Sequence, residues 1–285
     1  MNSIAYEQFS RLERDHWWFR GRREVYLGVL RAALGDWRPR RILDIGAGVG
    51  GFLPELEKLG GELLFTEFDA ESAKRARDRG FNRALQASAD RLPLADESVD
   101  LVCMFDVIEH LERDEQALSE VMRVLRPAGR LVLSVPAHAW LFSRNDEVSG
   151  HFRRYSRGEL RRKIQGCGLQ LDRCTFANSL LFPAIAGVVL ARRLGEVCLP
   201  KLGHREHTNL SLKMPDALQQ LCYRAFSVEL KLSRNWDLPL GHSLLAIAEK
   251  RTLAARPLVL FPQPQPASRL QPSPAEFASC SSNQR

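Results

Sequence analysis

The segment 41–51 joins a short apolar run to a cluster of glycines. Ile42, Leu43 and Ile45 are typical of a buried strand, and glycines follow at positions 46, 48, 50 and 51. Glycine has no Cβ, so the backbone N–H groups of such a loop can approach a ligand closely. The pattern predicts a ligand site of the nucleotide type directly after a strand.

Two classes of cofactor fit this loop, and Asp44 favours one of them. Gly46, Gly48 and Gly51 match the G-x-G-x-x-G pattern of dinucleotide sites. A dinucleotide brings a pyrophosphate, which a carboxylate two residues before the first glycine would repel. S-adenosylmethionine (SAM) carries an ammonium and a sulfonium group and no phosphate, so the same acid favours its binding. An ordinary acid at a strand end is the alternative for Asp44.

Two further segments have the chemistry to hold a nucleoside. Glu67 lies 21 residues after Gly46, and a carboxylate there can accept both hydroxyl groups of a ribose. Asp69 is the competing acid, and a solvated loop position is the alternative for both. After the next expected strand, Ser88 or Asp90 could accept from the amino group of adenine, with the backbone N–H of Ala89 donating to the ring. A plain loop is the alternative there.

The elements that must position these residues alternate between strands and helices. The apolar runs predict strands over 41–46, 63–68, 83–87, 99–105, 131–135, 169–176 and 243–248. Helical spacing and capping signals predict helices over 52–59, 70–79, 114–125 and 156–166, with 126–129 ending the third. This alternation predicts an α/β fold with a doubly wound, mostly parallel sheet and ligands at the carboxyl ends of the strands.

The pattern of strands, helices and composition also predicts how the chain is divided into segments. We expect an N-terminal helical cap over 1–35, a SAM-binding α/β core over 36–178, a helical insertion covering the acceptor over 179–241, a last core strand over 242–250 and a disordered, proline-rich tail over 251–285. Residues 137–157 are polar and aromatic without a clear periodicity. The sequence therefore predicts one large domain with an insertion.

The stretch 175–191 contains no charged residue and is flanked by arginines at 173, 192 and 193. It is too short, and too interrupted by Pro183 and Gly187, for a transmembrane helix. A buried helix or lid is one interpretation, and contact with a lipid surface through the basic flanks is the other.

Composition limits the class of protein. The net charge of +7 favours anionic partners, although scattered arginines can serve solubility alone. The six cysteines show no metal-binding spacing, and the N-terminus is polar. These features predict reduced cysteines and a cytoplasmic protein, located at the inner face of the membrane if 175–191 contacts lipid.

Six blocks in order resemble the class I SAM-dependent methyltransferases of the small-molecule type: 43–48, 67–69, 92–93, 98–102, 106–110 and 124–129. The resemblance covers most of 15–250 and implies a Rossmann-like sheet of seven strands, the last antiparallel. Blocks at 16–23, 135–137, 140–143, 146–147, 151–155 and 239–243 resemble a bacterial subgroup with poorly defined acceptors, associated in outline with glycan and lipid-sugar pathways.

The resemblance also implies roles for the cofactor residues. The methionine end of SAM would be held by Asp44, Gly46, Ala47 and Gly48. The ribose would be held at Glu67, Phe68 and Asp69, the adenine at Ser88, Ala89 and Asp90, and Asp106 would lie near the methyl donor. The family often has aspartate at the position of Ser88, so Asp90 is the expected substitute. Trp18 and Arg22 either close over SAM or, with their neighbours, belong to the core.

The acceptor side carries the weaker signals. Methyl transfer from a sulfonium needs positioning and exclusion of water, and a base only if the acceptor must lose a proton. Candidate bases near the expected strand ends are Glu109, His110, His138 and His151, with His110 and His151 as the first choices and structural roles as the alternative for each. Arg153, Arg154 and Tyr155 form a candidate cluster for an anionic acceptor. No metal site is predicted.

The predicted function is methyl transfer from SAM to a small molecule, with a lipid-linked or glycan-related acceptor as one option. A SAM-binding protein without catalysis, or a methyltransferase acting on nucleic acid or protein, is the alternative. Nucleic acid is not an expected partner, because the sequence shows no RNA-binding module and no Asn-Pro-Pro-Tyr-like tetrad after the fourth strand. Asp44 and the 92–93 block disfavour an NAD-dependent dehydrogenase.

Overall fold

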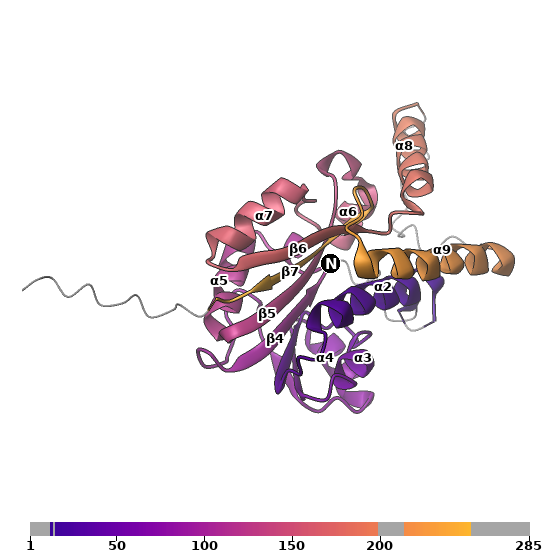
Figure 1. Ribbon diagram of the computed structural model, residues 1–285. Coiled ribbons are helices and arrows are strands. Elements are labelled where there is room, and N and C mark those ends of the chain that lie inside the picture. Colours follow the sequence, from indigo (N-terminus) through magenta and orange to yellow (C-terminus); the bar gives the residue numbers. More distant parts are fainter. Residues whose placement is uncertain (1–11, 14, 199–213, 252–285) are drawn as a thin grey trace, which may run out of the picture. The chain divides into compact units, whose positions relative to one another are not determined.

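A sheet of seven strands lies at the centre of the computed structural model, which describes residues 12–13, 15–198 and 214–251 (Figure 1). The strand order is β3-β2-β1-β4-β5-β7-β6. The strands are β1 (Arg41–Ile45), β2 (Glu62–Glu67), β3 (Ala84–Gln86), β4 (Val99–Phe105), β5 (Leu125–Pro136), β6 (Gln170–Ala177) and β7 (Ser243–Glu249). β7 pairs antiparallel with both β5 and β6, and the other four strand pairings are parallel. The predicted doubly wound sheet with an antiparallel last strand is confirmed.

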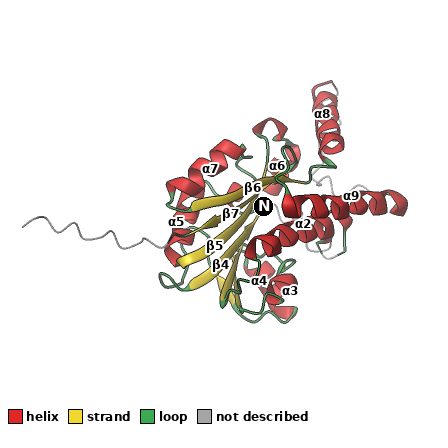
Figure 2. Cartoon of the chain, viewed as in Figure 1, coloured by secondary structure: helices red, strands yellow, loops and turns green. Residues whose placement is uncertain are grey.

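Helices cover both faces of this sheet (Figure 2). In β4, Val102 and Met104 face the core shared with α5 (Asp114–Val124) and α7 (Arg157–Gly166). Leu101 and Cys103 face the opposite core, shared with α2 (Trp17–Leu34) and α9 (Asp216–Asn235). Apart from Asp100 at its amino end, the strand is apolar, because both of its faces are buried. The short helix α3 (Leu53–Glu57) and α4 (Ala70–Asp78) follow β1 and β2.

The N-terminal helix and the insertion meet through α2 and α9, which lie side by side in Figure 1. Gly21 and Gly28, two turns apart on α2, face Phe226 and Leu230 of α9. A Cβ at these glycines would lie 2.1 and 2.0 Å from those side chains. The absence of side chains at both positions lets the two helices approach closely. The carboxylate of Glu229, on α9, accepts the backbone N–H groups of residues 178, 179 and 180.

The start of the fifth strand differs from the sequence prediction. A turn was expected over 126–129 and a strand from 131, but β5 begins at Leu125, immediately after α5 ends. Leu125 pairs with Val99, and the register then shifts before Arg130 pairs with Leu101. Pairing with β4 therefore makes the expected turn part of β5. The strand is irregular there, and Ala128 has a φ of 62°.

Three short elements lie outside the strands and helices that the sequence predicted. They are η1 (Ile108–His110), η2 (Ala139–Leu141) and α6 (Arg144–Ser149). The signal for α6 is the pair Ser143 and Asp146, because the Asp146 carboxylate accepts the backbone N–H of Ser143 at 2.9 Å. The expected tail falls, except for Arg251, on residues that the structure does not describe.

The uncharged stretch 175–191 spans two elements. Its first residues end β6, and α8 (Phe182–Cys198) begins further on. Phe182, Ala186 and Val189 of α8 pack against Leu141. None of the described helices combines the length and the apolar character that a membrane crossing requires.

Candidate functional site

The glycine loop leaves β1 at the carboxyl edge of the sheet. The backbone N–H groups of Gly46 and Ala47 donate to the Thr66 carbonyl at 2.8 and 3.1 Å, which ties the loop to the end of β2. Gly46 and Gly48 have φ values of 70° and 59°, a conformation that disfavours other residues. A Cβ at Gly46 would also lie 2.8 Å from a methyl carbon of Val107. The local backbone therefore requires glycine at position 46.

Two of the predicted acids flank this loop. Asp44 is buried in β1, and burial raises the pKa of its carboxyl well above the ordinary value, with the charges of Glu13 and Glu67 adding to the effect. Glu67 is buried at the end of β2. Its two carboxylate oxygens accept the N–H of Gly48 at 2.7 Å and that of Asp69 at 3.0 Å. The structure thus brings Asp44, Glu67 and Gly48 to one place.

A third acid, Glu13, reaches the loop from the N-terminal segment and was missed in the sequence. One carboxylate oxygen accepts the Gly51 N–H at 3.1 Å, and the other is buried without a hydrogen-bond partner. Burial raises the pKa of Glu13 to about 7, although Arg79 and Arg23 oppose the shift. No local motif marks this residue, because 38 positions separate it from Gly51.

The residues expected around the ribose and adenine lie beside one another along the carboxyl edge. Asp69 caps α4, since its carboxylate accepts the Ser72 N–H at 2.7 Å. Phe68 is 74% exposed, so its aromatic ring is available to cover a ligand. Ala89 is buried, while Ser88 and Asp90 are half-buried. A cavity of about 220 Å³ is lined by residues 86, 87, 91, 92 and 93, which flank the segment 88–90 in the sequence.

Asp106 follows β4 and connects the sheet to α2. Its φ of 57° is unusual for a residue other than glycine. One carboxylate oxygen accepts the Ser134 hydroxyl at 3.0 Å, and the other forms an ion pair with Arg22. The Arg22 guanidinium also donates to the Tyr26 hydroxyl and lies 5.6 Å from the Trp18 ring. Trp18 itself packs against Phe226, so Arg22 reaches the carboxyl edge and Trp18 joins the α2–α9 contact.

The two candidate bases, His110 and His151, lie with their ring centres 4.7 Å apart. His110 ends η1, and His151 follows α6. Burial, together with the charge of His151, lowers the pKa of His110 to about 3, so its imidazole is neutral at pH 7. The adjacent Glu109 is fully buried, and burial raises the pKa of its carboxyl to about 8.

The expected anion-binding cluster at 153–155 is not brought together on the surface. Arg154 is buried, and its guanidinium donates to Asp146 at 2.8 Å and to the Ala137 carbonyl at 3.2 Å. Tyr155 is completely buried, and its hydroxyl donates to Asp114 at 2.8 Å. Only Arg153 has a partly exposed side chain, which contacts the Glu112 carbonyl. The polar side chains of Arg154 and Tyr155 therefore form contacts inside the protein, and of these three residues only Arg153 is partly exposed.

Comparison with known proteins agrees with this geometry. Residues 43–133, which contain the glycine loop, Glu67 and Asp106, match the family model of a methyltransferase domain. A probable S-adenosylmethionine-dependent methyltransferase from Mycolicibacterium smegmatis is 28% identical over 164 residues, covering 56% of this chain and 62% of the relative. Residues 43–133 thus form a methyltransferase domain, and the chain is similar to SAM-dependent methyltransferases.

Further relatives extend the comparison. A ubiquinone/menaquinone biosynthesis C-methyltransferase from Azotobacter vinelandii is 33% identical over 131 residues, covering 41% of this chain and 52% of the relative. The match thus spans between half and two thirds of the length of these two curated relatives. The crystal structure of a putative sarcosine dimethylglycine methyltransferase from Galdieria sulphuraria shares the fold, with a TM-score of 0.53 and 19% identity over 81% of this chain and 86% of the other.

The acids around the glycine loop fit SAM. Glu13, Asp44 and Glu67 converge on one loop, and burial of carboxylates is unfavourable unless positive charge offsets it. The sulfonium and ammonium groups of SAM would supply that charge, whereas the pyrophosphate of a dinucleotide would add to the repulsion. The buried Glu13 oxygen without a partner is a further acceptor for such a cation.

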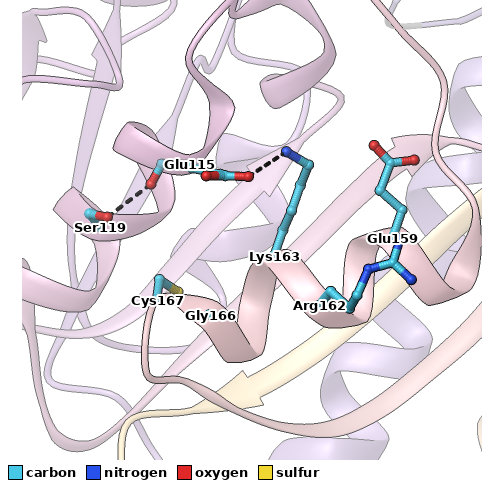
Figure 3. A pocket seen from close by; sticks show the side chains of 7 residues that line it. All are labelled: Glu115, Ser119, Glu159, Arg162, Lys163, Gly166 and Cys167. Atoms are coloured by element: carbon cyan, nitrogen blue, oxygen red, sulfur yellow. Dashed lines mark hydrogen bonds and ion pairs between the residues drawn. The ribbon is translucent and has the colours of Figure 1, made fainter.

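A larger cavity, of about 370 Å³, lies between α5 and α7 outside the predicted site (Figure 3). Its lining is mostly charged and polar, and Lys163 reaches across it to the Glu115 carboxylate at 2.9 Å. None of the residues predicted for the methyltransferase site lines it. The cavity is therefore separate from the glycine loop and the cofactor residues.

Replacing Glu13 with glutamine should stabilise the ligand-free protein at pH 8 and weaken SAM binding. The folded-state pKa of Glu13, about 7, lies above its ordinary value of 4.5, so ionisation opposes folding. The gain in unfolding free energy from glutamine is absent below pH 4.5, grows between pH 4.5 and 7 and is complete above, at about 3 kcal/mol. We expect a higher melting temperature at pH 8 and an approximately tenfold higher Kd for SAM by calorimetry.

The matched control is Glu71→Gln on α4, where the side chain is 60% exposed and pairs with Arg75. It should change neither quantity appreciably. An unchanged Kd in Glu13→Gln would remove this acid from the SAM site.

Proposed function

We propose that this chain is an enzyme that transfers the methyl group of SAM to a small-molecule acceptor. The observation that carries the proposal is the convergence of Glu13, Asp44 and Glu67 on the glycine loop of a methyltransferase domain. In methyl transfer, the acceptor atom attacks the methyl carbon in line with the leaving sulfur. The sulfonium charge disperses as the bond breaks, so the site acts mainly by positioning the reactants and excluding water.

The cofactor contacts in this proposal follow the carboxyl edge of the sheet. Asp44 and the N–H groups of the glycine loop bind the methionine end, and Glu67 accepts the ribose hydroxyl groups. The adenine lies between Phe68 and the segment 88–90. Asp106, held by Arg22, borders the methyl donor, and Arg22 and Trp18 shield this side from water.

The acceptor side lies beyond Asp106, where η1 and the segment after α6 meet. His110 and His151 face one another there, and Arg153 is the arginine of its segment with a partly exposed side chain. The relative named for ubiquinone and menaquinone biosynthesis supports an acceptor that is a small organic molecule. A lipid-linked or glycan-related acceptor is the narrower form of the proposal.

Transfer of label from [methyl-³H]SAM tests the function. The panel should include phenols and quinols, lipid-linked sugars, free sugars, RNA and protein. We expect label in one small-molecule class and none in RNA or protein. Tight SAM binding without transfer to any class would favour a SAM-binding protein without catalysis, and label in RNA or protein would reject the small-molecule acceptor.

We also propose that the protein is cytoplasmic and that α8 contacts the inner face of the membrane. Val188 and Leu190 of α8 are 48 and 43% exposed, Leu180 just before the helix is 47% exposed, and the exposed Arg192 follows them. Apolar side chains with adjacent basic residues favour binding to anionic lipid surfaces. The cysteines at 103, 167, 174 and 222 are unpaired, which suits a reducing compartment.

Sedimentation with vesicles containing anionic phospholipid measures this contact. Val188→Glu should reduce the bound fraction several-fold. Leu218→Glu is the control, because this leucine is 44% exposed on a different helix, α9, and it should bind as the wild type does. Equal sedimentation of both variants and the wild type would reject the contact through α8.

A further inference from the structure

Three side chains with metal-binding groups meet beside the proposed acceptor site. One ligand atom each from Glu109, His110 and His151 lies within 4.8 Å of the others. Glu109 and His110 belong to η1, which follows β4 closely, while His151 comes from the segment after α6. The Phe152 N–H donates to the Glu109 carbonyl at 2.7 Å, which fixes the two segments against each other. This backbone contact therefore fixes the positions of the three side chains relative to one another.

The Glu109 carboxyl is the strongest sign that a ligand is bound here. Its side chain is completely buried, and neither carboxylate oxygen has a hydrogen-bond partner. A buried carboxyl without partners is costly, and native structures rarely leave one in that state. A bound cation would supply the interaction that both oxygens lack.

The two histidines are oriented as metal ligands usually are. Nδ1 of His110 lies 3.1 Å from the Gly150 carbonyl oxygen, and Nδ1 of His151 lies 2.8 Å from a carboxylate oxygen of Asp146. Because these oxygens can only accept, each Nδ1 carries a proton, and in a neutral imidazole the lone pair then lies on Nε2. Outer contacts of this kind fix the tautomer and the ring orientation of metal-binding histidines.

Charges around the cluster do not prevent a cation from binding. Arg22 and Arg154 are the neighbouring cations, and each is already paired with a carboxylate, Asp106 and Asp146 respectively. The inner ligands would be one carboxylate and two neutral imidazoles, and the Asp146 carboxylate lies just outside.

We propose that Glu109, His110 and His151 bind a divalent transition-metal cation. Two imidazoles and one carboxylate suit Zn²⁺ and its first-row neighbours, whereas Mg²⁺ and Ca²⁺ prefer ligand sets made of oxygen. Three protein ligands leave a coordination position for an oxygen atom from outside. If the proposed methyl transfer holds, that position suits an acceptor hydroxyl, whose proton a metal makes easier to remove. The histidines would then act as ligands and not as bases.

Metal binding is measured on the untagged full-length protein without SAM, after treatment with EDTA. Titration with Zn²⁺ should show one site per chain that involves this cluster, and Co²⁺ should produce visible absorption bands typical of nitrogen and oxygen ligands. Glu109→Gln and His151→Gln should each weaken Zn²⁺ binding at least about tenfold. Glu109→Gln keeps the shape of the side chain, and circular dichroism and the melting temperature confirm that each variant is folded.

His138→Asn is the matched control. His138 lies outside the cluster and has a φ of 66°, a conformation that asparagine tolerates. It should bind Zn²⁺ as the wild type does. Absence of Zn²⁺ binding in the wild type, or equal binding in Glu109→Gln, His151→Gln and the wild type, would overturn the proposal. Because SAM binding is titrated separately, failure of the metal site leaves the proposed methyl transfer intact and is distinguishable from its failure.

Discussion

Replacing Asp44 with asparagine should raise the Kd for SAM by about 100-fold or more. Asp44 is buried at the carboxyl end of β1, beside the loop proposed to bind the methionine end. Loss of one partner from a buried charge pair costs about 2–5 kcal/mol, and 100-fold corresponds to about 2.7 kcal/mol. Isothermal titration of SAM into wild type and variant measures the difference.

The same substitution should not lower the stability of the ligand-free protein. Burial, with the charges of Glu13 and Glu67, raises the pKa of Asp44 well above its ordinary value, so its ionised form opposes folding. An amide of the same shape removes that cost. We therefore expect an unchanged or higher melting temperature together with the loss of SAM binding, a combination that unfolding cannot produce.

Asp100→Asn provides a control in the neighbouring strand. Asp100 lies at the opposite, amino end of β4, where its carboxylate accepts the N–H groups of residues 40 and 41 and pairs with Arg126. This variant should lose some stability and retain its affinity for SAM. Equal SAM affinity in wild type and Asp44→Asn would reject Asp44 as a cofactor residue.

Replacing Arg154 with methionine should destabilise the protein by about 3–5 kcal/mol, the usual cost of breaking a buried ion pair. The side chains of Arg154 and Asp146 are 4% and 0% exposed, so the variant leaves a buried carboxylate without its guanidinium partner, in contact with the His151 imidazole. For a domain of this size, the melting temperature should fall by about 10 °C. Thermal unfolding followed by circular dichroism measures the change.

The pH dependence of this loss has a definite sign. Burial favours the neutral form of Asp146, but hydrogen bonds and charges from His151 and Arg154 outweigh it and hold the pKa well below the ordinary value of 3.8. A group with a depressed folded-state pKa contributes its stability above its unfolded pKa, and this contribution is lost as the pH falls. The difference between wild type and Arg154→Met should be full at pH 7 and shrink below about pH 4.

The neighbouring arginine is the matched control. The Arg153 side chain is 31% exposed, so Arg153→Met should cost no more than about 1 kcal/mol. In the double variant Asp146→Asn, Arg154→Met, the unpaired charge is gone and part of the loss should return. Similar melting temperatures for Arg153→Met and Arg154→Met would contradict the buried pair.

Local sequence determined the sheet and the donor side of the site. Runs that are almost entirely apolar, such as Val99–Phe105 with Asp100 as its exception, predicted buried strands, and β4 has those bounds. The glycines at 46 and 48 and the spacing to Glu67 could be read directly, because a loop that lies close to its ligand needs small residues and positive φ. The alternation of strands and helices predicted a doubly wound sheet, whereas the strand order itself comes from the structure.

Contacts between distant segments decided the rest. The start of β5 depends on its pairing with Val99, and Glu13 reaches the loop only through the path of the N-terminal segment. Arg154 and Tyr155 looked like surface residues, yet they are buried because Asp146 and Asp114 satisfy them from other elements. Likewise, the sequence predicted no metal site, since His151 meets Glu109 and His110 across 40 residues of chain. Polarity and spacing determine local structure, whereas burial and charge pairing depend on partners that only the tertiary fold supplies.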